Sequence, residues 1–248
     1  QMKMFGTCTI LLLFFLIDTI STAAVTTFPR ATGNVTYTNA RVLAQNEIFD
    51  GAMRRFDRGR GACKQQVEGG KADAVFILEN GATLKNVIIG PDQAEGVHCQ
   101  GSCNIINVWW EDVCEDALTI RQISGTTRIT GGGAKSAQDK VIQHNGGGTI
   151  IVTDFYVQDF GKLWRSCGNC GTQYPRHLQL NGVIAKNGKV LAGGNGNYND
   201  TVRISNTCAT NVNSICDTYK GCNNGCAPAK ISSGPSNVCL YRTTDIRC

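Results

Sequence analysis

Short runs of apolar and β-branched residues recur along this chain, each closed by Gly, Asn or Asp, and no long stretch shows helical periodicity. A polar residue stands at or just after the end of six of these runs, at intervals of roughly 20 to 28 residues. The six residues are Asn86, Asn107, Thr130, Thr153, Asn181 and Asn206. Because a coil of stacked β-strands needs about this length to rise and return, the spacing predicts a β-solenoid.

The runs themselves are the predicted strands. They occupy residues 74–78, 84–89, 104–110, 117–120, 127–130, 140–142, 149–152, 177–180 and 201–204. A β-sandwich or barrel is the alternative, although its turn signals would fall every 8 to 12 residues. The Arg-rich residues 25–65 are expected to cap one end of the stack, and the Cys-dense tail from residue 207 is expected to be a stapled loop region.

The N-terminus resembles a secretory signal peptide over residues 1–24. Lys3 is followed by an apolar run at 10–17 and by small residues at 21–24. A membrane anchor is the alternative, but the run is shorter than the ~20 residues that span a bilayer. The sequence therefore predicts an extracellular protein with one domain over 25–248 and no membrane attachment after cleavage. Asn34 and Asn199 fit the glycosylation pattern.

The cysteines agree with export. The chain has 13, and Cys8 lies in the signal segment, which leaves 13 − 1 = 12. An even count in an exported chain indicates a disulfide framework whose pairing spacing alone does not reveal. The Cys99–Cys103 and Cys167–Cys170 spacings resemble zinc sites, but export favours disulfides. The net charge of +5 is spread without a polybasic run, which disfavours nucleic acid and is compatible with an acidic glycan.

One group of acidic residues suggests a metal site. In a coil of about 20 residues, Glu95 and Glu115 are expected to stack, with Asp116 beside them. Carboxylates that converge on one face repel one another unless a cation is present, and hard oxygen ligands favour Ca²⁺. A solvated acidic loop is the alternative explanation on spacing alone.

A group of basic residues follows downstream. Lys140 and Lys162 are about one coil apart, and Arg165 comes three residues later. A row of cations beside a calcium site is a plausible cradle for a polyanionic chain, whereas each cation taken singly is an ordinary surface residue.

Several long motifs resemble pectate lyases of polysaccharide lyase family 3, in its cysteine-rich fungal and nematode form. They are EGVHCQGSC at 95–103, NVWWEDVCEDALT at 107–119, AKSAQDKV at 134–141, FGKLWRSC at 160–167 and FILENGATLKNVIIG at 76–90. The resemblance covers roughly residues 45–245. It implies an all-β, single-stranded, right-handed parallel β-helix stapled by disulfides. It also implies β-elimination of α-1,4-polygalacturonate to 4,5-unsaturated oligogalacturonates.

The resemblance also assigns roles to residues. It places calcium ligands at Glu95, Glu115 and Asp116, the catalytic base at Lys140, a contact to the reacting region at Arg165, and substrate contacts at Lys162 and Arg121. Two positions depart from the family. Glu95 stands where bacterial members usually have Asp, and Cys114 replaces a Gly and is expected to join a disulfide.

The base must be neutral to accept a proton, so we expect Ca²⁺, Lys162 and Arg165 to lower the pKa of Lys140 and activity to favour alkaline pH. Two other functions remain open: an inactive module that binds pectate with calcium, and a structural solenoid without ligand. His98 and His144 are weaker candidates for acid–base work, and His98 is interpreted as a structural histidine. The protein is expected to be a monomer.

Overall fold

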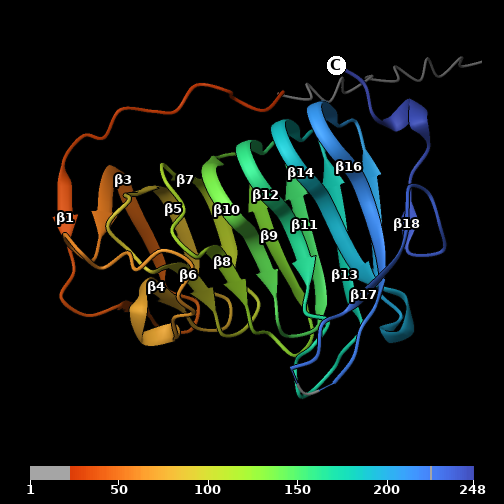
Figure 1. The fold of residues 1–248 in the computed structure, drawn as a ribbon. Helices are drawn as coiled ribbons and strands as arrows, with labels where there is room; N and C mark the ends of the chain where they lie inside the picture. Colours follow the sequence, from red (N-terminus) through yellow and green to blue (C-terminus); the bar gives the residue numbers. More distant parts are fainter. Residues whose placement is uncertain (1–22, 224) are drawn as a thin grey trace, which may run out of the picture.

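The computed structural model describes residues 23–223 and 225–248, and its framework is a stack of β-strands (Figure 1). The strands are β1 Asn34–Thr36, β2 Arg41–Leu43, β3 Ile48–Asp57, β4 Ala74–Leu78, β5 Thr83–Ile89, β6 Glu95–Cys99, β7 Asn104–Trp110, β8 Asp116–Ile120, β9 Thr126–Thr130, β10 Gly133–His144, β11 Gly148–Thr153, β12 Tyr156–Ser166, β13 Arg176–Asn181, β14 Ile184–Asn195, β15 Thr201–Ser205, β16 Cys208–Lys220, β17 Ala229–Ser233 and β18 Cys239–Leu240. Two short 3-10 helices, Lys71–Asp73 and Gly196–Tyr198, lie between strands, and a third, Thr243–Asp245, follows β18. Every predicted run falls within one of these strands.

Apart from β16 and β17, strands pair in parallel with the strand one coil away and not with their neighbours in sequence. β4 pairs with β6, β6 with β8, and β8 with the second half of β10, so each turn adds one strand to the same face. The second halves of β12, β14 and β16 continue this face, which we call the site face. The predicted right-handed parallel β-helix is confirmed. The sandwich alternative is wrong, because among the described residues β16–β17 is the one antiparallel pair.

The feature that repeats at the coil corners is a left-handed backbone conformation. It recurs at Asn86, Asn107, Gly131, Asp154, Gly182 and Asn206, where φ lies between 46° and 69°. Gly, Asn and Asp adopt this conformation at the lowest cost, which explains the residue types at the corner. The predicted phase was therefore one residue early at Thr130, Thr153 and Asn181. Side-chain amides also stack between coils, since Asn107 Nδ2 donates to Asn86 Oδ1 at 2.9 Å.

The core runs along the axis as rows of apolar side chains at equal height. One such row lies on the site face, and all of its members are buried in the main core. It comprises Phe76, Val97, Leu118, Ile142, Trp164, Ala192 and Cys216. Because each member must meet the next to bury its surface, this row sets the register of the polar residues that precede it on the same strands.

The two ends differ from the expectation. Residues 25–65 do more than cap the stack, because β1, β2 and β3 pair in parallel with β3, β4 and β5 respectively. The segment before β1 runs back along the outside of the stack (Figure 1), where the Phe28 ring lies 5.0 Å from that of Trp109. The tail is not only a stapled loop: residues 208–220 form the long strand β16, which pairs in parallel along β14.

Disulfides tie successive coils and loops together. All twelve cysteines of 25–248 are paired, as Cys63–Cys114, Cys99–Cys103, Cys167–Cys170, Cys208–Cys248, Cys216–Cys239 and Cys222–Cys226. The predicted framework is confirmed, including a disulfide at Cys114, and the two zinc-like spacings are disulfides.

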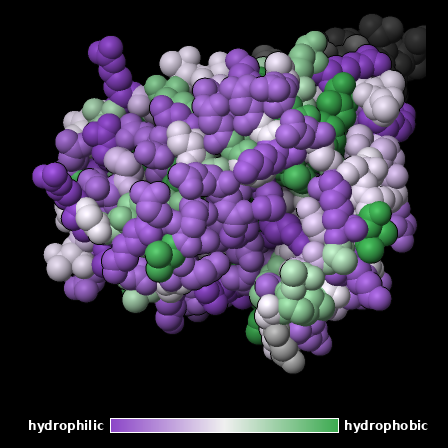
Figure 2. Space-filling view, in the orientation of Figure 1, coloured by the Kyte–Doolittle hydropathy of each residue, from purple (hydrophilic) through white to green (hydrophobic). Residues whose placement is uncertain are grey.

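The face shown in Figure 2 is mainly hydrophilic, with small scattered hydrophobic patches. In the described part of the chain, no helix has the length and apolar character needed to cross a membrane. The predicted signal segment lies largely outside the described residues.

Candidate active site

Four charged residues predicted from sequence lie at one height on the site face. The register pairs Glu95 with Asp116, Asp116 with Lys140, and Lys140 with Lys162. The expected stacking of Lys140 and Lys162 is confirmed. The expected stacking of Glu95 on Glu115 is wrong by one residue, because Val97 and Leu118 pack at equal height and so align Glu95 with Asp116.

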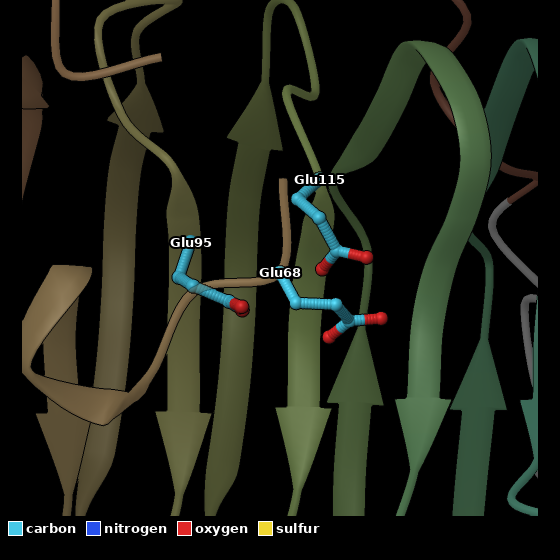
Figure 3. Close-up of side chains that lie close together, drawn as sticks. All are labelled: Glu68, Glu95 and Glu115. Atoms are coloured by element: carbon cyan, nitrogen blue, oxygen red, sulfur yellow. The ribbon is translucent and has the colours of Figure 1, made fainter. Parts of the chain in front are cut away.

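Glu115 nevertheless reaches the same space from the turn that precedes β8. Its carboxylate lies with those of Glu95 and Glu68, and one oxygen from each falls within 4.8 Å of the others (Figure 3). Glu68 enters from the loop between β3 and β4. That loop is tied to the coil by the Cys63–Cys114 disulfide and by Gln66 Nε2, which donates to the Cys114 carbonyl at 2.6 Å.

Sequence reasoning missed Glu68. The residue belongs to no strand and repeats no coil spacing, so periodicity carries no signal for it. The pairing of Cys63 with Cys114 would have indicated that this loop folds over the acidic pair, but spacing alone does not reveal pairing.

The acidic residues are arranged as a cation site would require. Glu115 Oε2 is buried and has no hydrogen-bond partner among the described residues, and Asp116 Oδ1 is buried with only an ion pair to Lys140 at 3.4 Å. Burial raises the pKa of Glu115, and burial together with Glu115 and Glu95 raises the pKa of Asp116 well above its ordinary value. Buried carboxylate oxygens with unused lone pairs fit a hard divalent cation such as Ca²⁺.

Glu95 is oriented by its own partners. The imidazole Nε2 of His98 lies 2.9 Å from Glu95 Oε2, and the Thr119 hydroxyl donates to the same oxygen at 3.4 Å. His98 is 1% exposed and holds a carboxylate in place, which agrees with its structural interpretation. His144 is also structural: it is buried, its Nε2 lies 3.1 Å from the Gly147 carbonyl, and burial lowers its pKa to about 3.

Lys140 sits among carboxylates. Its Nζ donates to Asp139 Oδ2 and lies 3.4 Å from both Glu115 Oε1 and Asp116 Oδ1. Burial disfavours the ammonium and lowers the pKa of Lys140, but Asp116, Asp139 and Glu115 outweigh burial and raise that pKa above its ordinary value. Among the protein's own groups, the direction is thus opposite to the one expected from sequence.

Asp139 explains why Lys162 does not depress that pKa. Lys162 Nζ donates to Asp139 Oδ1 at 2.6 Å, while Lys140 occupies the other oxygen of the same carboxylate. The two lysines share one anion, so their mutual repulsion is offset. Burial alone would raise the pKa of Asp139, but the hydrogen bonds and positive charges of Lys140 and Lys162 outweigh burial and lower it overall.

The two arginines predicted to contact substrate, Arg165 and Arg121, lie in different parts of the structure. Arg165 lies on the next strand beside Gln143 and lines a cavity of about 240 Å³. The other residues lining this cavity include Glu68, Asp139, Lys140, Gln143 and Lys162. Arg121 is exposed and follows β8, five residues and ~16 Å of extended chain beyond Asp116. The structure therefore groups Arg165 with the lysines and leaves Arg121 away from them.

This arrangement defines a class of protein: a parallel β-helix whose carboxylate cluster lies beside a cavity lined by two lysines and an arginine, suited to an acidic polysaccharide. The family model for pectate lyase matches residues 25–226, and the chain belongs to the pectate lyase family. It is an enzyme of that family, as the motifs indicated.

Named relatives and solved structures agree. The chain is 57% identical over 215 residues to pectate lyase H of Emericella nidulans, covering 86% of this chain and 82% of the relative. It is 54% identical over 222 residues to a probable pectate lyase E of Aspergillus fumigatus, covering 89% and 86%.

Among solved structures, the catalytic domain of pectate lyase PelI from Erwinia chrysanthemi superposes with a TM-score of 0.73 at 30% identity, covering 87% of this chain and 97% of that one. PelI in complex with tetragalacturonic acid gives a TM-score of 0.70 at 31% identity, covering 83% and 68%.

Proposed function

We propose that this enzyme cleaves α-1,4-polygalacturonate by β-elimination, with Ca²⁺ held by Glu95, Glu115 and Asp116 and with Glu68 as a further ligand. The observation that carries the proposal is the group of buried carboxylates with unused oxygens, which Glu68 joins from the loop. Lys140 lies one coil away from Asp116 and Lys162 two coils away, and both lysines line a cavity together with Glu68. A hydrolase would need two carboxylates free to act as acid and base, whereas here the neighbouring groups are cationic.

The reaction requires loss of the weakly acidic C5 proton of a galacturonate residue, followed by departure of the C4 oxygen. When bound, Ca²⁺ would stabilise the negative charge that spreads into the C6 carboxylate as this proton leaves. Lys140, which is 8% exposed on the cavity wall, accepts the proton in this proposal. Lys162 and Arg165 bind uronate carboxylates, and the guanidinium adds charge-assisted hydrogen bonds.

Lys140 must lose its proton before it can act as a base. Its ammonium is stabilised by Glu115, Asp116 and Asp139, and two of these three are proposed cation ligands. A cation on those ligands competes with the ammonium for the same oxygens, so calcium binding and deprotonation of Lys140 favour each other. Activity is therefore expected to need both calcium and alkaline pH.

The remaining sequence-based assignments are part of the same proposal. We propose cleavage of a signal peptide over 1–24, secretion of a single 25–248 domain, and action as a monomer. Six disulfides support an oxidising destination, since such bonds persist outside the cytosol. Asn34 and Asn199 are exposed and thus accessible for glycosylation.

One assay tests the function and its alternatives. Purified protein is mixed with polygalacturonate and Ca²⁺, and the ultraviolet absorbance of the unsaturated uronate product is followed. Growth of absorbance that EDTA abolishes supports the lyase. Calcium-dependent binding of polygalacturonate without growth would replace the proposal with an inactive binding module, and growth that persists in EDTA would overturn the role of calcium.

A further inference from the structure

The guanidinium of Arg165 is held along one edge. Nη1 donates to the Ser166 carbonyl at 2.7 Å, to the Gly193 carbonyl at 3.2 Å and to Asn195 Oδ1 at 3.2 Å. Among the described residues, Nε and Nη2 donate to no protein acceptor, although Arg165 lines the cavity. One edge of the planar group is thus anchored to β14 and to the end of β12, and the other is left for a ligand.

The anchoring edge is itself rigid. Asn195 is 0% exposed, and its Nδ2 donates to Asp200 Oδ2 at 3.1 Å and to Ser166 Oγ at 2.8 Å. Asp200 in turn accepts from the backbone N–H groups of Asn195 and Arg176 at 2.7 and 3.0 Å. The Asn195 side chain, whose Oδ1 accepts from Arg165, therefore has little freedom to move.

The flat face of the guanidinium is covered by Tyr219, which lies near the end of β16. The Cζ atom of Arg165 is 3.9 Å from the ring centroid. Gly193 makes this approach possible, because a Cβ atom there would lie 3.0 Å from the Tyr219 ring and 3.2 Å from Arg165 Cδ. The hydroxyl at the edge of the ring donates to Asp217 Oδ2 at 3.2 Å.

We propose that Tyr219 is a positioning residue: its ring and the Asn195 edge fix the plane of Arg165, so that Nε and Nη2 present a preformed two-donor fork to a uronate carboxylate. The inference rests on the proposed function, in which Arg165 contacts the substrate. Tyr219 itself need not touch the substrate and acts through Arg165.

A fixed plane matters because bidentate recognition of a carboxylate demands both donors at once. An arginine free to rotate still attracts the anion but spends only part of its time in the productive geometry. Loss of the ring should therefore reduce kcat more than it raises KM. A stacked guanidinium–aromatic contact of this kind corresponds to a change of about 3- to 30-fold.

The test compares Tyr219→Ala, Tyr219→Leu and Tyr219→Phe on polygalacturonate with Ca²⁺. We expect a loss of about 3- to 30-fold in kcat for the first two, with KM within about threefold, and rescue by Tyr219→Phe to within about twofold. Leu keeps apolar volume without a ring face, so it remains informative if the Ala variant folds poorly. The matched control is Phe28→Ala, which removes a ring 4.6 Å from Lys135 Nζ on another face and should leave kcat unchanged.

Combination with Arg165→Lys separates the inference from the proposed function. The lysine keeps a charge but has no planar face, so Tyr219→Ala should cost less than about twofold in that background. An equal loss in both backgrounds, or wild-type kcat in both Tyr219→Ala and Tyr219→Leu, overturns the positioning role alone. If Arg165→Ala retains wild-type activity, the proposed contact of Arg165 with substrate fails, and the inference fails with it.

Discussion

The Cys63–Cys114 disulfide connects the loop carrying Glu68 to the coil carrying Glu115, so its removal should affect both stability and calcium binding. The bond joins residues 51 apart in sequence, and closing a loop of that length in the unfolded chain corresponds to about 4 kcal/mol of stabilisation. Replacing both cysteines by Ser should lower the free energy of unfolding by up to about that amount.

The second effect is local. Glu68 lies five residues from Cys63, and without the tether the loop keeps the Gln66 side-chain bond to the Cys114 backbone but loses its covalent hold. A carboxylate that must be ordered on binding contributes less affinity than one already in place. We expect the Ca²⁺ concentration for half-maximal activity to rise on the order of 10-fold, at the low end of the effect of removing a group that holds a metal ligand in place.

Cys208–Cys248 provides the control. Its residues are 40 apart, which corresponds to a similar ~4 kcal/mol, but the bond lies at the C-terminal end of the stack. Guanidinium unfolding followed by tryptophan fluorescence measures stability, and calcium titration of product absorbance measures the site. If both double-Ser variants lose stability but keep the same calcium requirement, the loop is not part of the cation site. If the Cys63/Cys114 variant unfolds at the wild-type denaturant concentration, the entropic argument is wrong.

Three further predictions concern single residues. Lys140→Ala should abolish turnover while preserving the circular dichroism spectrum and the melting temperature within a few degrees; substantial turnover would exclude Lys140 as the base. Asp116→Asn should abolish stabilisation by calcium. In EDTA, however, this variant should melt at a higher temperature than wild type above pH ~4. Folding raises the pKa of Asp116 above 3.8, so the wild-type protein loses stability as the pH rises from 3.8 through the raised pKa, and Asn avoids that loss. A lower melting point in EDTA across this range would contradict the pKa argument. Asp139→Asn removes the anion shared by Lys140 and Lys162, so the pKa of Lys140 should fall and the rise of activity with pH should occur at lower pH. A rise at the wild-type pH would argue against Lys140 as the titrating group.

Much of the fold follows from local pattern. The apolar runs predicted the strands, and their spacing predicted the coils, because every coil must bury one inward row and turn at a corner that tolerates a left-handed residue. The expectation for the tail failed because cysteine density was taken as a sign of loop. In the structure, residues 208–220 pair in parallel along β14, so Cys208 and Cys216 lie in a strand.

The sequence pattern determined the relative positions of the site residues less fully than it determined the strands. Coil length placed Glu95, Asp116, Lys140 and Lys162 near one another, but a count of about 20 residues does not resolve a shift of one, and the packing of apolar side chains in the core decided the register. Glu68 depends on a disulfide that spacing does not specify.

The charge state of the site depends on distances between coils. By itself the sequence determined which groups line the site face: carboxylates first, then lysines, then Arg165. Only the tertiary structure decided how they act on one another. It placed Lys140 within reach of three carboxylates, which raises its pKa, and brought Tyr219 from two coils further on to cover Arg165. Electrostatic and stacking energies change over a few ångströms, and separations on that scale are set by packing across the coils and not by position along the chain.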